Sequence, residues 1–147
     1  MALGNLDEIY RDDVILDHRR NPRNPVRLND PDIVADGVNP FCGDEIHLQI
    51  RLDYEGRVSE VGFQGEGCSI NQATGSMLSE AIKGLTPNEA AGLSDRFHTM
   101  MQGSEPTPEQ LAGLGDLGSL ANVRDFPVRI KCALLAWSTL EDGLESA

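Results

Sequence analysis

The hydrophobic pattern of the N-terminal residues is helical. Residues 6–20 carry apolar side chains at helical spacing behind Asn5, a residue type that caps helices well. Two prolines in residues 21–25 then stop the pattern, because proline cannot continue a helix. The sequence therefore predicts an N-terminal helix over residues 6–20.

The pattern changes to alternation in the next third of the chain. Residues 45–53 alternate between an apolar and a polar face, residues 57–64 repeat the period, and residues 54–57 have the composition of a hairpin turn. Residues 33–38 read as a further short strand. We expect a small antiparallel sheet of about three strands with one buried face.

The second half of the chain returns to helical spacing. A helix is predicted over residues 70–83, a second from the capping box at residues 86–89 to about residue 102, and a last one from about residue 125. The Pro/Gly-rich residues 103–118 carry one short helix that begins at residues 107–108. Strands covered by helices give an α+β fold class.

The length and net charge of the chain limit the classes of function that it can have. The 147 residues are enough for a single domain over residues 1–147, and the net charge is −12. Such a chain is repelled by nucleic acid and by anionic membranes, so we expect neither as a partner. The first residues lack the basic head and apolar stretch of a secretory signal, which favours a cytoplasmic protein with reduced thiols.

The three cysteines stand apart, without any CxxC pair. Cys42 leads into the alternating strand, Cys68 begins a predicted helix where the helix dipole favours a thiolate, and Cys132 lies in the second turn of the last helix. Asp44 has the same parity as Cys42 and should face the helix-covered side of the sheet, with Gly43 allowing the backbone to curl. Three thiolates and one carboxylate form a tetrahedral set suited to Zn²⁺.

Cations beside these residues would offset the negative charge of such a site. Arg129 and Lys131 flank Cys132 on the last helix, and both are candidates for contacts with the thiolates. The alternative is that the cysteines are small buried apolar residues, which fits Cys132 best, and that Asp44 is a turn or strand-start residue.

The segments around the cysteines resemble the signature motifs of the IscU/NifU N-terminal family of iron–sulfur cluster assembly proteins. These segments are NPFCGD at 39–44, GEGCSI at 65–70 and RIKCA at 129–133, and the likeness extends over nearly the whole chain. Two features resemble the SufU branch of the family. Lys131 stands where IscU proteins have a histidine, and residues 103–118 look like the SufU insertion.

This resemblance implies an IscU/NifU-like α+β fold, a bound metal and a partner enzyme. It implies a zinc ion held by Cys42, Asp44, Cys68 and Cys132, and a SufS-type cysteine desulfurase as the sulfur donor. It further implies that a partner histidine replaces Cys42 on zinc, that Cys42 accepts the persulfide sulfur, and that the sulfur passes to downstream cluster-assembly proteins. A glycine-flanked Cys42 can move more easily than two cysteines anchored in helices.

Two other functions stay open at this stage. The same ligands could assemble a transient [2Fe–2S] cluster, against which the missing histidine counts, or the zinc could be purely structural. The histidines have simpler roles: His18 is expected to cap the end of the first helix, and His47 to lie on the solvated face of the sheet.

Overall fold

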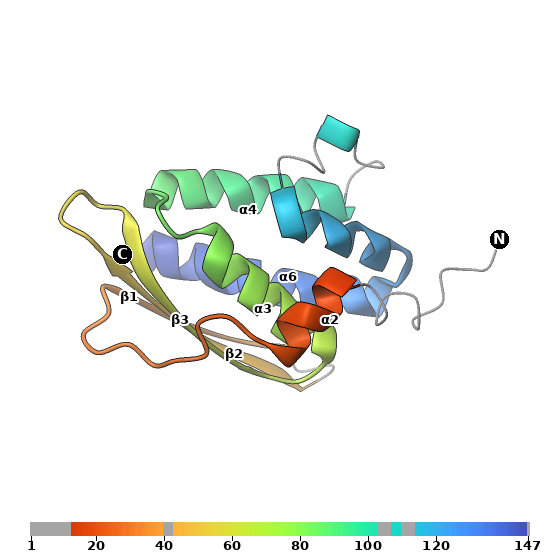
Figure 1. Cartoon of the computed structure of the whole chain (residues 1–147), viewed down its shortest axis with the longest axis horizontal. Helices are drawn as coiled ribbons and strands as arrows, with labels where there is room; N and C mark the ends of the chain where they lie inside the picture. Colours follow the sequence, from red (N-terminus) through yellow and green to blue (C-terminus); the bar gives the residue numbers. More distant parts are fainter. Residues whose placement is uncertain (1–12, 40–42, 103–106, 110–113, 147) are drawn as a thin grey trace.

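The computed structural model describes residues 13–39, 43–102, 107–109 and 114–146. A single sheet forms one layer and the helices cover one of its faces, as Figure 1 shows. The strands are β1 (Ile33–Asn39), β2 (Asp44–Leu52) and β3 (Val58–Glu66), antiparallel in the order β1-β2-β3. The predicted α+β class and three-stranded antiparallel sheet are confirmed.

Strand β2 lies at the centre of the sheet and shows the predicted alternation. Ile46, Leu48 and Ile50 are buried under the helices, whereas Glu45 and His47 are exposed on the other face. The register places Asp44 opposite Asn39 of β1, and Glu45 opposite Glu66 of β3. The start of β2 and the end of β3 therefore meet at one end of the sheet, which is where Asp44 and Cys68 lie.

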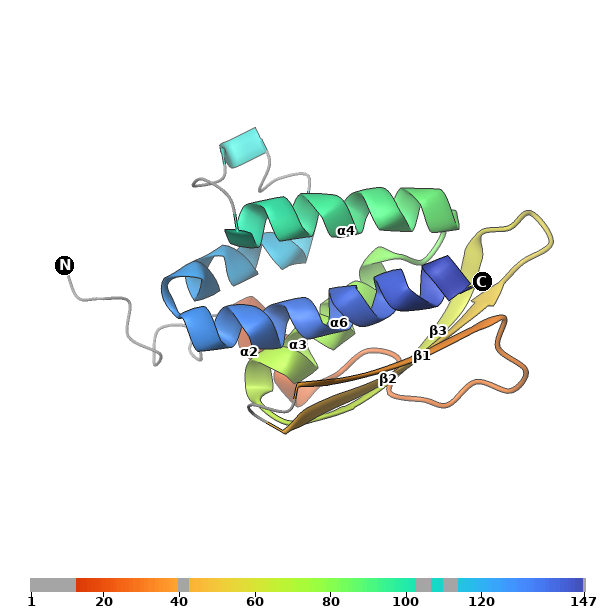
Figure 2. The same cartoon turned by 180° about the vertical axis from the view of Figure 1, so that it is seen from behind.

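Two layers of helix stand above the sheet. The helical elements are α2 (Asp13–Arg20), α3 (Ser69–Ala81), α4 (Pro87–Gln102), the 3₁₀ helix η1 (Gly115–Asp125) and α6 (Pro127–Ser146). Helix α3 packs on β3, and α6 runs along β1, which is seen from behind in Figure 2. Helices α4 and η1 pack on α6 from outside, and the Phe97 ring of α4 stacks on Trp137 of α6 at 5.2 Å.

Most helix boundaries agree with the sequence. The predicted capping box is present at the start of α4: Thr86 N–H donates to Glu89 Oε1, and Glu89 N–H donates to Thr86 Oγ1. The bond from the Thr86 backbone holds the pKa of the Glu89 carboxyl below its usual value. Of the first predicted helix, residues 13–20 are helical, and residues 6–12 lie outside the described part of the chain.

Helix η1 was not predicted from the sequence. Its buried residues Leu117, Leu120 and Val123 recur every third position, which is the period of a 3₁₀ helix rather than an α-helix. A search at period three would have found this element. The short helix expected after residue 107 begins at Pro108, and residues 103–106 and 110–113 of the predicted insertion lie outside the described residues.

Within the described ranges, no helix combines the length and apolar character needed to cross a bilayer.

The contact between α3 and β3 generates the first prediction. A Cβ on Gly75 of α3 would overlap the ring of Phe63 on β3, so the two elements approach more closely than a side chain at position 75 permits. Gly75→Ala should lower the free energy of unfolding by about 1–3 kcal/mol through overpacking, measured by urea denaturation.

Gly92→Ala in α4 is the matched control. Position 92 is exposed in the same helical conformation, with open space around its Cβ. That variant should gain about 0.5–1 kcal/mol, as alanine usually does over glycine in a helix. Equal gains in both variants would contradict the close packing of α3 on β3.

Candidate metal centre

Three of the four predicted ligands come together at one end of the sheet. The ligand atoms of Asp44, Cys68 and Cys132 all lie within 4.8 Å of one another. In the part of the chain that is described, no other three His, Cys, Asp or Glu side chains form such a group. Residues far apart in sequence are therefore brought within reach of a single metal ion.

Each of these residues is fixed by a different element. Asp44 is the first residue of β2 and points to the helix-covered side, as its parity predicts, with 1% of its surface exposed. Cys68 is the N-cap of α3 and is half-buried. Cys132 lies in the second turn of α6 and is fully buried. Because all three sit at the ends of rigid elements, the site is held in place by the fold.

Hydrogen bonds orient the Asp44 carboxylate toward Cys68. The Cys68 backbone N–H donates to Asp44 Oδ1 at 2.9 Å, and Asp44 Oδ2 lies 3.7 Å from Cys68 Sγ. The Asn71 backbone N–H points at Cys68 Sγ from 3.5 Å, as an N-cap contact. One carboxylate oxygen is thus held by the backbone, and the other faces the thiol.

This separation fits a metal ligand pair. Sulfur and oxygen ligands on a tetrahedral zinc ion, at about 2.3 Å and 2.1 Å from the metal, lie roughly 3.6 Å apart. The distance of 3.7 Å between Cys68 Sγ and Asp44 Oδ2 agrees with that value. Two thiols and a carboxylate are also a donor set that suits zinc and other thiophilic metals.

Gly67 makes room for the Asp44 carboxylate. Its φ of 127° lies in the region that favours glycine, and a Cβ there would overlap Asp44 Oδ1. The residue before Cys68 must therefore be glycine both for its backbone conformation and for the close approach of Asp44. Its place in the GEGCSI motif does not by itself reveal this contact with Asp44.

Cys42, the predicted fourth ligand and sulfur acceptor, lies outside the described residues. The neighbouring Gly43 is exposed, has a φ of 71°, and would have open space around a Cβ. The predicted curl of the backbone at Gly43 is therefore present. Cys42 stays a predicted ligand, because it lies two residues before Asp44 in the sequence.

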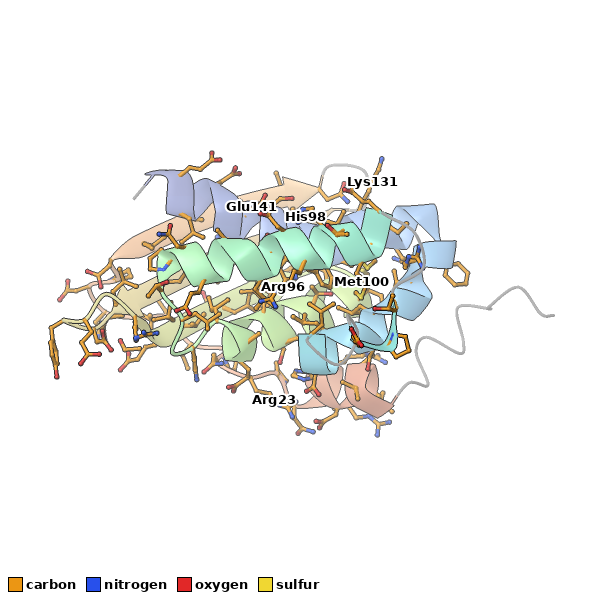
Figure 3. The ribbon with its side chains drawn as sticks, turned by 90° about the horizontal axis from the view of Figure 1, so that it is seen from above. Arg23, Arg96, His98, Met100, Lys131 and Glu141 are labelled. Carbon is orange, nitrogen blue, oxygen red and sulfur yellow. The ribbon has the colours of Figure 1, made fainter. Side chains whose placement is uncertain are left out.

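The two predicted cations lie on α6 near Cys132. Arg129 is half-buried and Lys131 is exposed, and Figure 3 shows Lys131 directed outward from the N-terminal part of the helix. Contacts of these cations with the thiolates stay a prediction.

Two histidines lie away from the candidate centre. His47 is on the exposed face of β2, as predicted, with Nδ1 2.6 Å from Asp36 Oδ1. His98 lies between α4 and α6, 2.9 Å from the Ser94 carbonyl and 3.6 Å from Glu141 Oε1 (Figure 3).

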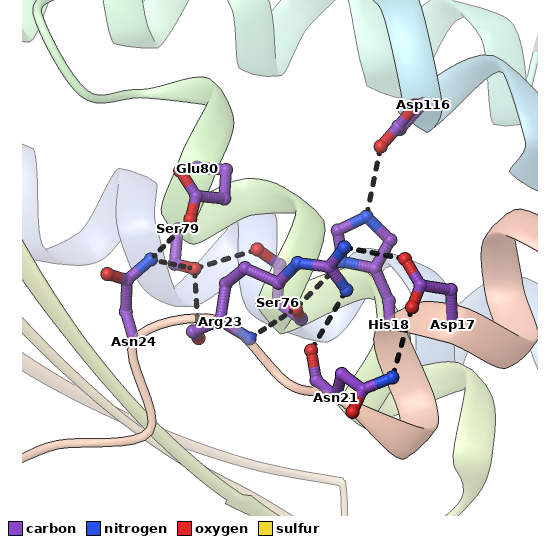
Figure 4. Close-up of polar contacts among 9 residues, drawn as sticks. All are labelled: Asp17, His18, Asn21, Arg23, Asn24, Ser76, Ser79, Glu80 and Asp116. Carbon is purple, nitrogen blue, oxygen red and sulfur yellow. Dashed lines mark hydrogen bonds and ion pairs between the residues drawn. The ribbon is translucent and has the colours of Figure 1, made fainter.

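The sequence predicts that His18 caps the end of the first helix, but both of its ring nitrogens contact other elements. His18 is in the last turn of α2, but only 2% of it is exposed. Its Nδ1 lies 2.7 Å from Ser76 Oγ of α3, and its Nε2 lies 3.0 Å from Asp116 Oδ2 of η1 (Figure 4). The spacing from Val14 and Ile15 places His18 on the apolar face of α2, which is the signal that could have shown its burial.

The residues after His18 fasten the N-terminal segment to α3. The Arg23 backbone N–H donates to Ser76 Oγ, and the Asn24 side chain donates to Ser79 Oγ (Figure 4). Arg23 also pairs with Asp17, and this bond holds the pKa of the Asp17 carboxyl below its usual value. The C-terminal half of α3, the helix that Cys68 caps, is therefore braced by the N-terminal segment.

Substitution of Gly67 tests the geometry of the centre. Gly67→Ala should displace the Asp44 carboxylate and lower the affinity for a divalent metal by about 10–100-fold, measured by competition with a chromophoric chelator. Gly56→Ala, at a φ of 80° in the β2–β3 turn with open space around the Cβ, imposes backbone strain without that contact. An equal affinity in the two variants would show that Gly67 does not act through Asp44.

Comparison with known proteins identifies the family of the chain. The NifU-like N terminal domain family matches residues 9–145. The chain is 49% identical over 141 residues to the zinc-dependent sulfurtransferase SufU of Bacillus subtilis (strain 168), covering 96% of this chain and 92% of that protein. It is 37% identical over 145 residues to the iron–sulfur cluster assembly scaffold protein IscU of Streptococcus pyogenes serotype M1, covering 99% and 88%.

A solved structure supports the same assignment. The iron–sulfur cluster assembly scaffold protein for the SUF system from Fervidobacterium islandicum AW-1 superposes with a TM-score of 0.82 at 31% identity, over 95% of this chain and 99% of that one. Family match, sequence identity and shared fold lead to one conclusion: the chain belongs to the NifU-like N-terminal domain family of iron–sulfur cluster assembly proteins.

Proposed function

We propose that the chain is a zinc-dependent sulfur acceptor in iron–sulfur cluster assembly. It takes the terminal sulfur of a persulfide from a SufS-type cysteine desulfurase and passes it to downstream cluster-assembly proteins. The observation that carries the proposal is the convergence of Asp44, Cys68 and Cys132 within 4.8 Å. The identity to a Bacillus subtilis protein named for zinc-dependent sulfur transfer supports it.

Cys42, Asp44, Cys68 and Cys132 would hold the zinc ion. Bound zinc would keep the thiolates deprotonated and lower their reactivity until one of them is needed. Three thiolates and one carboxylate around Zn²⁺ carry a formal charge of about −2, which is costly to bury without nearby cations. Arg129 and Lys131 are the cations that α6 supplies beside Cys132.

Cys42 is the proposed acceptor. Its thiolate attacks the terminal sulfur of the desulfurase persulfide, forming a new sulfur–sulfur bond on Cys42 while the bond within the desulfurase persulfide breaks. The desulfurase cysteine leaves as a thiolate, so one sulfur atom moves and no external oxidant or reductant is consumed. The open space around Gly43 supports this choice, whereas Cys68 and Cys132 are fixed at the starts of α3 and α6.

The proposed chemistry and the charge of the chain indicate a cellular compartment and the kind of surface that the partner offers. Free thiolates persist in a reducing compartment, so we place the protein in the cytoplasm. The net charge of −12 favours a partner that offers a basic surface around its persulfide.

A second candidate is a scaffold that assembles a transient [2Fe–2S] cluster on the same residues. The 37% identity to a Streptococcus pyogenes protein named as an IscU scaffold favours it. The two candidates differ in the metal that the protein retains, because a cluster requires iron and sulfide together.

The metal content tests the first candidate against the second. Protein purified anaerobically should contain about one zinc and negligible iron by elemental analysis. Asp44→Ala should lower the zinc affinity by at least about tenfold, whereas Asp36→Ala, which removes an exposed carboxylate on the opposite sheet face, should leave it unchanged. Bound iron would favour the scaffold, and unchanged zinc affinity in Asp44→Ala would remove the carboxylate from the ligand set.

The acceptor assignment is tested with a SufS-type desulfurase. Wild-type protein should increase sulfide release from cysteine in the presence of a reductant, and Cys42→Ala should abolish most of this increase because the nucleophile is gone. Mass spectrometry of cleaved peptides should find the added sulfur on Cys42. Full stimulation by Cys42→Ala would show that another thiol accepts the sulfur.

A further inference from the structure

Asn71 is a fully buried polar residue in the first turn of α3, beside the candidate centre. Its backbone N–H points at Cys68 Sγ from 3.5 Å, and its side-chain Nδ2 donates to the Glu66 carbonyl at 3.2 Å. Its Oδ1 is buried and has no hydrogen-bond partner among the described residues. The side chain therefore uses its donor and leaves its acceptor unmatched.

The adjacent residue makes a parallel contact. Gln72 Nε2 donates to the Gly67 carbonyl at 3.2 Å. The carbonyls of the two residues before Cys68 are thus both held by amide side chains from the same helical turn. Gln72 is half-buried, so water competes for its bond, whereas Asn71 is shielded from solvent. Asn71 is therefore the stronger of the two contacts.

The unmatched acceptor indicates that the Asn71 side chain does not serve to stabilise the fold. A buried acceptor without a partner destabilises the folded chain. An apolar side chain of the same size would suit the burial better. The value of the amide must then lie in the conformation that it imposes on the loop.

We propose that Asn71 is a positioning residue that sets the separation between Cys68 Sγ and the Asp44 carboxylate. Asn71 holds the Glu66 carbonyl and thereby fixes the peptide bond between Glu66 and Gly67. The Asp44 carboxylate lies close against the Gly67 backbone. The next peptide then directs the Cys68 N–H to Asp44 Oδ1. This inference rests on the proposed zinc site, because the pair that Asn71 positions is the proposed ligand pair.

The full-length Asn71→Leu variant separates positioning from stability. Its zinc-free form should unfold in urea at the same or a higher concentration than wild type, since the unmatched acceptor is gone. Its zinc affinity should nevertheless fall by about 10–100-fold in competition with a chromophoric chelator. The visible absorption bands of its Co²⁺-substituted form should shift, because the ligand geometry changes.

Thr74→Val is the matched control. Thr74 is buried one turn further along α3, and its side-chain hydroxyl donates to the Ile70 carbonyl of its own helix, with no other side-chain bond among the described residues. Its zinc affinity should stay within about twofold of wild type, and its Co²⁺ spectrum should be unchanged. Asn71→Ala serves as a second variant if the leucine does not fold, with the same loss of affinity expected.

The outcomes are distinguishable. Wild-type affinity and an unaltered Co²⁺ spectrum in the Asn71 variants, with wild-type protein binding zinc, would overturn the role of Asn71 alone. A loss of affinity that only parallels a loss of zinc-free stability would assign Asn71 a structural role and overturn positioning. Failure of the wild-type protein to bind zinc would instead overturn the proposed function.

Discussion

The hydrogen bond from the Cys68 N–H to the Asp44 carboxylate joins the first residue of β2 to the cap of α3. It holds one carboxylate oxygen and turns the other toward the Cys68 thiol, 3.7 Å away. A carboxylate that is 1% exposed would be costly to bury without such a donor. The same contact therefore satisfies a buried charge and orients two ligand atoms, and the chemistry of the site depends on it.

The fold makes this bond possible through register and close packing. Pairing of Glu45 with Glu66 brings the loop before α3 alongside the start of β2, and Gly67 lets the carboxylate approach the backbone. Gly75 lets α3 lie close to β3, while Arg23 and His18 brace the helix from outside through Ser76. The fold thus brings the three candidate ligands together, and such preorganisation reduces the ordering that binding requires.

Local patterns predicted the parts of the site that depend on one element. Alternation along β2 placed Asp44 on the buried face, and the change of period after residue 67 placed Cys68 at a helix start. The approach of Cys132 to the other two ligands depends on how α6 crosses the sheet, which spacing alone does not fix; the motifs shared with a known family supplied that expectation. The partners of His18 were missed for a related reason, because they come from two other elements.

Zinc K-edge X-ray absorption of anaerobically purified protein reads the proposed ligand set directly. We predict a shell of about three sulfur atoms near 2.3 Å and about one oxygen near 2.0–2.1 Å. That shell would correspond to Cys42, Cys68 and Cys132 with Asp44. A shell of oxygen and nitrogen alone, or iron in place of zinc, would contradict a zinc-dependent sulfur acceptor built on these residues.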